Sequence, residues 1–186
     1  MTGSVDYVDP AKVVDEIRKV HPELARIGTV YDASNQNSQV WIADLRSATG
    51  ERGMTLEEST IATSADLETA ARALVGRVDA ILIGPDATVV GGLPAVGQVA
   101  ATQQLPLYAT AADVTTAGLV ATLDPDYAAL GRMAGEAASE VYTGKAAGEV
   151  AFRRPGELVW ELNRGTVAQL GIDIPDDLLD RAGAAG

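Results

Sequence analysis

Strand-like segments alternate with helix-like ones along the first 110 residues of this chain. Segments rich in β-branched and other apolar residues that run into polar or glycine-containing turns predict strands at 26–31, 54–61, 78–83 and 105–109. Helical spacing of apolar residues predicts helices around 40–48, at 66–75 and from about 88 to 103. Strands joined through helices of this length lie parallel, with helices on both faces of the sheet. We therefore expect an α/β fold of three layers with a mostly parallel sheet.

The flanking segments fit the same domain. Asp9 and Pro10 are suited to the start of a helix that carries Val13, Val14, Ile17 and Val20, and Pro22 ends it. After residue 109 we expect a strand at 119–123 that follows a loop instead of a helix, a long helix at 126–141, a strand at 158–162 and two short terminal helices. Because no low-complexity linker interrupts the chain, we expect residues 1–186 to form a single domain.

Charge and residue usage exclude several classes of function. The net charge of −12 repels nucleic-acid backbones and anionic lipid, so neither is an expected partner. No apolar run approaches the ~18 residues that a membrane-spanning helix needs. The chain has no cysteine, which excludes disulfides, a thiol nucleophile and a thiolate metal site. We expect no cofactor and no bound metal.

Three polar turns follow predicted strands, at 34–38, 86–88 and 110–113. Ligands of open parallel sheets bind beyond the carboxyl ends of the strands. The first two turns also open helices, whose N-termini favour a carboxylate, while Asp86 or Asp113 could accept an ammonium group. This pairing suits an amino acid. The alternative is that these Asn, Ser, Asp and Thr residues are ordinary caps and turn formers, and the sequence leaves both interpretations open.

Enzymatic chemistry finds little support in the sequence. The single histidine, His21, precedes Pro22 at a helix end, where we expect a surface residue and not a base. No phosphate-binding, zinc-protease or serine-hydrolase motif occurs. Asp32 and Asp86 both follow strands, as the acidic residues of a receiver domain do, but the lysine of that fold is absent from 109–118. We expect Trp160 to pack in the core, and Trp41 to lie either in the core, which is favoured, or at the rim of a pocket.

Seven segments together resemble a known family, the ABC-transporter substrate-binding proteins related to the tryptophan- and tyrosine-binding lipoproteins. Each segment is short, but the seven occur in the order of the family and cover essentially the whole chain. They are 1–4 (MTGS), 26–38 (RIGTVYDASNQNS), 74–80 (LVGRVDA), 85–90 (PDATVV), 117–123 (AGLVATL), 126–132 (DYAALGR) and 170–175 (LGIDIP).

The resemblance implies a fold and a site. It implies two flavodoxin-like lobes that close on a ligand, with this chain equivalent to the C-terminal lobe of a type I periplasmic binding protein. The ligand-facing positions that it carries over are Ser34, Asn35, Asn37, Ser38, Asp86, Thr88 and Asp113. Ala87 stands where the family often has Asn, and Asp32-Ala33 replaces its usual Asn-Pro, which puts the identity of the ligand in doubt.

The implied function is capture of a small molecule such as an amino acid for an ABC importer, with an ABC permease as partner. Members act on the extracytoplasmic side, although this chain as given carries no export signal. We expect that a valine codon taken as a start, or a cut at this point, explains where the sequence begins. A ligand-sensing regulatory domain and, less favoured, a flavodoxin-like enzyme remain the alternatives.

The absence of a first lobe carries two expectations. In two-lobed proteins the strand and helix of 117–144 return to the first lobe. Without it, the helix face made by Leu130, Met133, Ala134, Ala137 and Val141 loses its partner, which favours a homodimer or a swapped arrangement through this element. Half a cleft also buries only part of a ligand, so the isolated chain should bind weakly or not at all.

Overall fold

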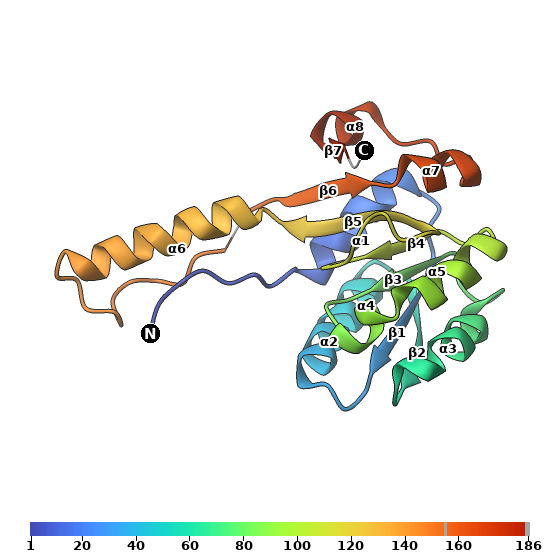
Figure 1. Cartoon of the computed structure of the whole chain (residues 1–186), viewed down its shortest axis with the longest axis horizontal. Helices are drawn as coiled ribbons and strands as arrows, with labels where there is room; N and C mark the ends of the chain where they lie inside the picture. Colours follow the sequence, from blue (N-terminus) through green and yellow to red (C-terminus); the bar gives the residue numbers. More distant parts are fainter. Residues whose placement is uncertain (155, 185–186) are drawn as a thin grey trace.

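The computed structural model describes residues 1–154 and 156–184, and these form one sheet covered by helices on both faces (Figure 1). The strands are β1 (Arg26–Asp32), β2 (Thr55–Ile61), β3 (Ala80–Ile83), β4 (Leu107–Ala109), β5 (Leu119–Pro125), β6 (Leu158–Leu162) and β7 (Gly183–Ala184). The helices are α1 (Pro10–Val20), α2 (Gln36–Glu51), α3 (Leu67–Leu74), α4 (Ala87–Gly91), α5 (Leu93–Thr102), α6 (Tyr127–Tyr142), α7 (Arg164–Leu170) and α8 (Asp176–Arg181), with a 3₁₀ turn η1 (Ser64–Asp66).

The strand order is β2-β1-β3-β4-β5-β6-β7. Neighbours from β2 to β5 are parallel, β5 and β6 are antiparallel, and β6 and β7 are parallel. The predicted α/β class with a mostly parallel sheet is confirmed. The carboxyl ends of β1, β3 and β4 therefore share one edge of the sheet, which is where the predicted site lies.

Two apolar cores separate the three layers. Helices α1, α2 and α8 cover one face with side chains that include Ile17, Trp41, Leu45 and Leu178. Helices α3, α4 and α5 cover the other face with Leu67, Leu74, Val89 and Val96 among their buried residues. Both tryptophans are core residues, as predicted, with Trp41 1% and Trp160 0% exposed.

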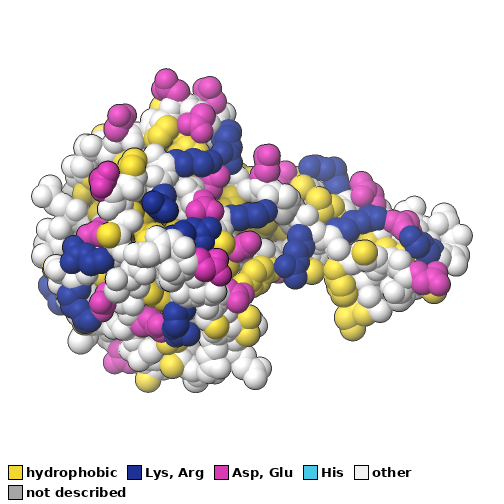
Figure 2. Space-filling model, turned by 180° about the vertical axis from the view of Figure 1, so that it is seen from behind, with side chains coloured by type: hydrophobic (Ala, Val, Ile, Leu, Met, Phe, Trp, Pro, Cys, Tyr) yellow, Lys and Arg dark blue, Asp and Glu magenta, His cyan; other side chains and the backbone are white. Residues whose placement is uncertain are grey.

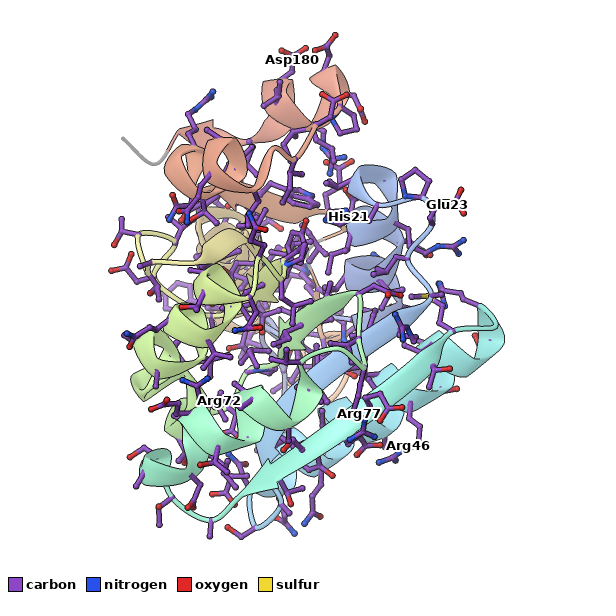
Figure 3. All side chains as sticks on the ribbon, turned by 90° about the vertical axis from the view of Figure 1, so that its right-hand side faces the viewer. His21, Glu23, Arg46, Arg72, Arg77 and Asp180 are labelled. Atoms are coloured by element: carbon purple, nitrogen blue, oxygen red, sulfur yellow. The ribbon has the colours of Figure 1, made fainter. Side chains whose placement is uncertain are left out.

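The edge strand β2 is protected by charge. Glu58 of β2 pairs with Arg46 at 2.9 Å, and Glu57 pairs with Arg77. Both arginines are labelled along this edge in Figure 3. Charged side chains on an edge strand disfavour pairing with a further strand.

The segment predicted as one helix from about 88 to 103 consists of two helices, α4 and α5, which meet at Gly92. Pro94 lies in the first turn of α5, where its missing N–H costs no hydrogen bond. A Cβ on Gly92 would lie 2.3 Å from the Leu67 side chain, so the break lets the chain pass close to α3. The pair Gly91-Gly92 followed by Pro94 is a local signal for this break, and the apolar periodicity that continues through it outweighed that signal in the prediction.

Helix α6 projects from the body, and two other segments run beneath it (Figure 1). We call α6 together with residues 1–5 and 145–153 the arm. Within it Ser4 and Arg153 form a parallel bridge, and the Arg153 guanidinium donates to the Met133 carbonyl oxygen at 3.2 Å. Arg153 also pairs with Glu136 and Glu140.

The segment 117–144 divides between the body and the arm. Its strand, β5, lies inside the sheet between β4 and β6, and its helix, α6, leaves the body (Figure 1). The helix face expected to be open is also partly covered, since Leu130 is 7% and Ala137 1% exposed, whereas Val141 is 36% exposed. The physical reason is that the N-terminal residues and 150–153 pack under α6, a long-range contact that helical spacing does not reveal.

Among the described residues, no helix combines the length and the apolar character needed to cross a bilayer.

Candidate functional site at the carboxyl edge of the sheet

The first two predicted site segments meet at the carboxylate of Asp86, which is 2% exposed. Its Oδ2 accepts hydrogen bonds from the Asp32 backbone N–H at 2.9 Å and from the Ser38 hydroxyl at 2.6 Å. Its Oδ1 accepts from the backbone N–H groups of Thr88 at 3.0 Å and Val89 at 3.3 Å. Asp86 thus caps α4 and at the same time ties it to the end of β1 and the start of α2.

Four donors leave Asp86 without capacity for a ligand ammonium group, because a carboxylate offers about four acceptor sites. Its place in the predicted site is therefore that of a positioning residue. Ser38 is buried with it, and its hydroxyl proton is directed at Asp86.

The other residues of the first turn have mixed roles. Asn35 caps α2, with Oδ1 accepting from the N–H groups of Asn37 at 3.0 Å and Ser38 at 3.4 Å. Ser34 turns back on Asp32, and its two hydrogen bonds hold the pKa of that carboxyl below its usual value. Asn37 is exposed at the first turn of α2, where it lines a groove. Thr88 is half-exposed at the start of α4.

Asp113 is not brought to this cluster. Its carboxylate accepts from the Thr115 N–H at 2.9 Å and hydroxyl at 2.7 Å, and these bonds lower its pKa. The loop from 110 to 118 crosses from the carboxyl edge, where Ala111 contacts Asp124, to the opposite edge, where Asn163 donates to the Val114 carbonyl oxygen. The predicted turn 110–113 therefore begins at the shared edge and leaves it.

A groove of about 340 Å³ lies beside the α2 N-terminus. It is lined by residues 5–8, Asn37, Val40, Trp41 and Pro85. The Trp41 indole N–H donates to the Val8 carbonyl oxygen at 2.9 Å, and the Tyr7 hydroxyl donates to Asp44. These bonds hold the N-terminal segment against α2, so one wall of the groove is fixed by a buried tryptophan.

A second cavity, of about 410 Å³, lies where β4, β5 and β6 reach the same edge. Asp124 lines it, together with Ala111, Tyr127, Val159 and Glu161. Asp124 was not singled out from the sequence, although it follows the apolar part of a predicted strand as the other polar turns do. Burial raises the pKa of Asp124, and the negative charge of Glu161 adds to the shift.

His21 differs from its predicted surface position. The residue is half-buried, and its Nε2 lies 2.7 Å from the hydroxyl oxygen of the buried Tyr108. Burial lowers the pKa of His21. In Figure 3 His21 lies at the end of α1, next to the core. Because Tyr108 is 0% exposed, this pair belongs to the packing of α1 on the sheet.

A mostly parallel sheet with polar helix starts and concave surfaces at its carboxyl edge is the arrangement in which α/β domains bind small ligands. The family model described as "ABC transporter substrate binding protein" matches residues 1–185. The chain belongs to this family of substrate-binding proteins. The resemblance noted from the sequence is confirmed.

Three relatives illustrate the similarity. A tyrosine-binding protein of Clostridioides difficile strain R20291 is 28% identical over 170 residues, which are 91% of this chain and 49% of the relative. An ABC domain from Streptococcus pneumonia in complex with L-Trp has a TM-score of 0.79 at 25% identity over 98% of this chain and 64% of that one. The ligand-free, open structure of CD0873, a substrate-binding protein with adhesive properties from Clostridium difficile, has a TM-score of 0.86 at 23% identity. The match covers 99% of this chain and 62% of that one.

The chain spans about half the length of the curated relative it matches.

Proposed function

We propose that this chain is the solute-recognition domain of an ABC importer and holds an amino acid at the carboxyl edge of its sheet. The main support is the joining of the β1–α2 and β3–α4 turns by Asp86 beside the groove of about 340 Å³. A volume of this size suits a small metabolite.

The groove favours an aromatic amino acid. Val8, Val40, Trp41 and Pro85 give it apolar walls, which suit a ring. The similarity to proteins described as tyrosine-binding and as holding L-Trp supports the same ligand class. Asn37, exposed in the first turn of α2, lines the groove and can donate from its side-chain amide to the ligand carboxylate. Ser34 and Thr88 belong to the two turns that Asp86 joins.

The proposal extends to partners and place. The domain delivers its ligand to an ABC permease and works on the extracytoplasmic side of the membrane. It binds and releases without chemical conversion, in keeping with a family of substrate-binding proteins.

Calorimetry of this chain with L-tryptophan and L-tyrosine tests the function. We expect a Kd weaker than about 1 µM, because a single open lobe covers only part of a ligand that complete pockets bury by 70–90%. Asn37→Ala should weaken binding further, while Gln103→Ala, at the far end of α5, should not. If NMR detects no binding of any amino acid at millimolar concentration, the proposed function is refuted. A submicromolar Kd would refute the expectation that half a cleft binds weakly.

We also propose that the arm associates with the arm of a second copy. Tyr142 is 93% and Phe152 54% exposed, and exposed apolar side chains lie among charged ones on the arm (Figure 2). Sedimentation velocity at high concentration should show a dimer that the double substitution Tyr142→Glu with Phe152→Glu converts to monomer. Gln98→Glu, which adds the same charge on the body, serves as control. A monomeric wild-type chain under these conditions would rule the dimer out.

A further inference from the structure

The acidic side chains at the carboxyl edge differ in the hydrogen bonds that their carboxylates already accept. Asp32 accepts two hydrogen bonds from Ser34, and Asp86 accepts four. Asp113 accepts two from Thr115, and Asp126 caps α6 through the Ala129 N–H at 2.8 Å. Each of these carboxylates is occupied by its own turn or helix start.

Asp124 is different. It lies near the end of β5, half-buried, and one oxygen accepts from the Ala111 N–H at 2.5 Å. Within residues 1–154 and 156–184 it takes part in no ion pair, and the nearest charge acting on it is the negative charge of Glu161. A half-buried carboxylate of this kind lacks the positive partner that would offset its desolvation.

The surroundings of Asp124 form a cavity suited to a small cation. The cavity of about 410 Å³ places Asp124 beside the Tyr127 ring, which is 58% exposed, with Val159 and Glu161 on the adjoining strand. Burial raises the pKa of Tyr127, and the charges of Asp124 and then Asp6 add to the shift. Tyr127 thus lines this cavity and is also acted on by the charge of Asp6, which lines the groove of about 340 Å³.

A buried hydroxyl lies on the same face as Asp124. Thr122 is 0% exposed, and its Oγ1 makes no hydrogen bond of normal geometry in the described part of the chain, although it is near enough to the Asp124 carboxylate to lower the pKa of that group. Thr122 lies two residues before Asp124 and directly opposite Glu161 in the β5–β6 ladder. Side chains in these positions share one face of a sheet, so Thr122 lies on the face that lines the cavity.

We propose that this cavity takes the protonated amine of the ligand, with Asp124 as the acceptor of its N–H groups. The inference rests on the proposed function and assigns the ammonium contact to Asp124 instead of Asp86 or Asp113. The Tyr127 ring offers a π face to the same cation, and Glu161 adds negative potential. Among the described residues no cluster of three or more potential metal ligands occurs, which favours an organic amine over a metal ion.

The test is a ¹H–¹⁵N NMR titration of this chain with three compounds: L-tryptophan, tryptamine, which lacks the carboxylate, and indole-3-propionate, which lacks the amine. L-tryptophan and tryptamine should shift the amides of Ala111, Asp124 and Glu161, while indole-3-propionate should leave them unmoved. Asp124→Asn keeps an acceptor for the Ala111 N–H and removes the charge. It should weaken binding of both amines at least about tenfold.

Asp180→Asn is the matched control, because Asp180 is an exposed acid on α8, remote from the edge (Figure 3). Equal binding of L-tryptophan by wild type and Asp124→Asn would overturn the inference and leave the proposed function intact. Loss of binding in Asp113→Asn but not in Asp124→Asn would do the same. Absence of any shift with L-tryptophan in the wild type would remove the proposed function and the inference with it.

Discussion

Replacing Gly84 with alanine is expected to lower the free energy of unfolding by about 2–3 kcal/mol, the upper part of the range for overpacked cores. A Cβ at this position would lie 2.4 Å from the Trp41 ring. The ring cannot withdraw easily, since it is 1% exposed and its indole N–H is held by the Val8 carbonyl oxygen. The strain would fall on the wall of the groove, so ligand binding should weaken together with stability.

Gly50→Ala is the matched control for this substitution. Gly50 lies in α2, and a Cβ there would meet nothing within 4 Å. Alanine in a helix interior is favoured over glycine by roughly 0.5–1 kcal/mol, so this variant should gain stability. Urea denaturation followed by tryptophan fluorescence measures both. An unchanged midpoint for Gly84→Ala would show that the contact with Trp41 can relax.

Asp86→Ala is expected to cost about 3 kcal/mol, because loss of a helix cap costs about 1 kcal/mol and buried donors left unpaired cost a further 1–3 kcal/mol. The donors left behind would be the Ser38 hydroxyl and the N–H groups of Asp32, Thr88 and Val89. The variant should also separate the β1–α2 turn from α4. Hydrogen exchange should then speed up at the Asp32 and Thr88 amides.

Asp9→Ala is the matched comparison, because Asp9 caps a helix but accepts no hydrogen bonds from distant segments such as those that Asp32 and Ser38 donate to Asp86. Asp9 is exposed and accepts one hydrogen bond, from the Ala11 N–H at 2.9 Å. This variant should cost about 1 kcal/mol, the usual value for a helix cap. Equal destabilisation by the two substitutions would mean that the bonds from Asp32 and Ser38 add nothing to stability.

The strands and most helices could be predicted from the sequence because their signals are local. Residues 27–30 form a continuous buried run, and Asp9, Asn35 and Asp126 each stand directly before a helix that they cap. The covering of α6 escaped prediction because it depends on contacts between segments distant in the chain. The break at Gly92 escaped because apolar periodicity outweighed its glycine and proline signals.

The candidate site was predictable only in outline. Polar turns after parallel strands identify the edge, and the sequence placed Ser38, Asp86 and Asn37 there. The sequence did not distinguish side chains that line a cavity from side chains that are hydrogen-bonded within their own turn. Asp113 and Asp124 look alike in the sequence, yet the first is bound to Thr115 and the second lines a cavity.

The sequence by itself determined the α/β class and the edge at which the strands end, because alternation and helix capping are set by residues close together in the chain. The tertiary structure alone decided which carboxylates remain available. Two of the four donors that saturate Asp86 belong to Asp32 and Ser38, 54 and 48 residues away, and the charge of Glu161 on β6 acts on Asp124 of β5. Contacts over such separations arise from the packing of the whole sheet, and no local pattern encodes them.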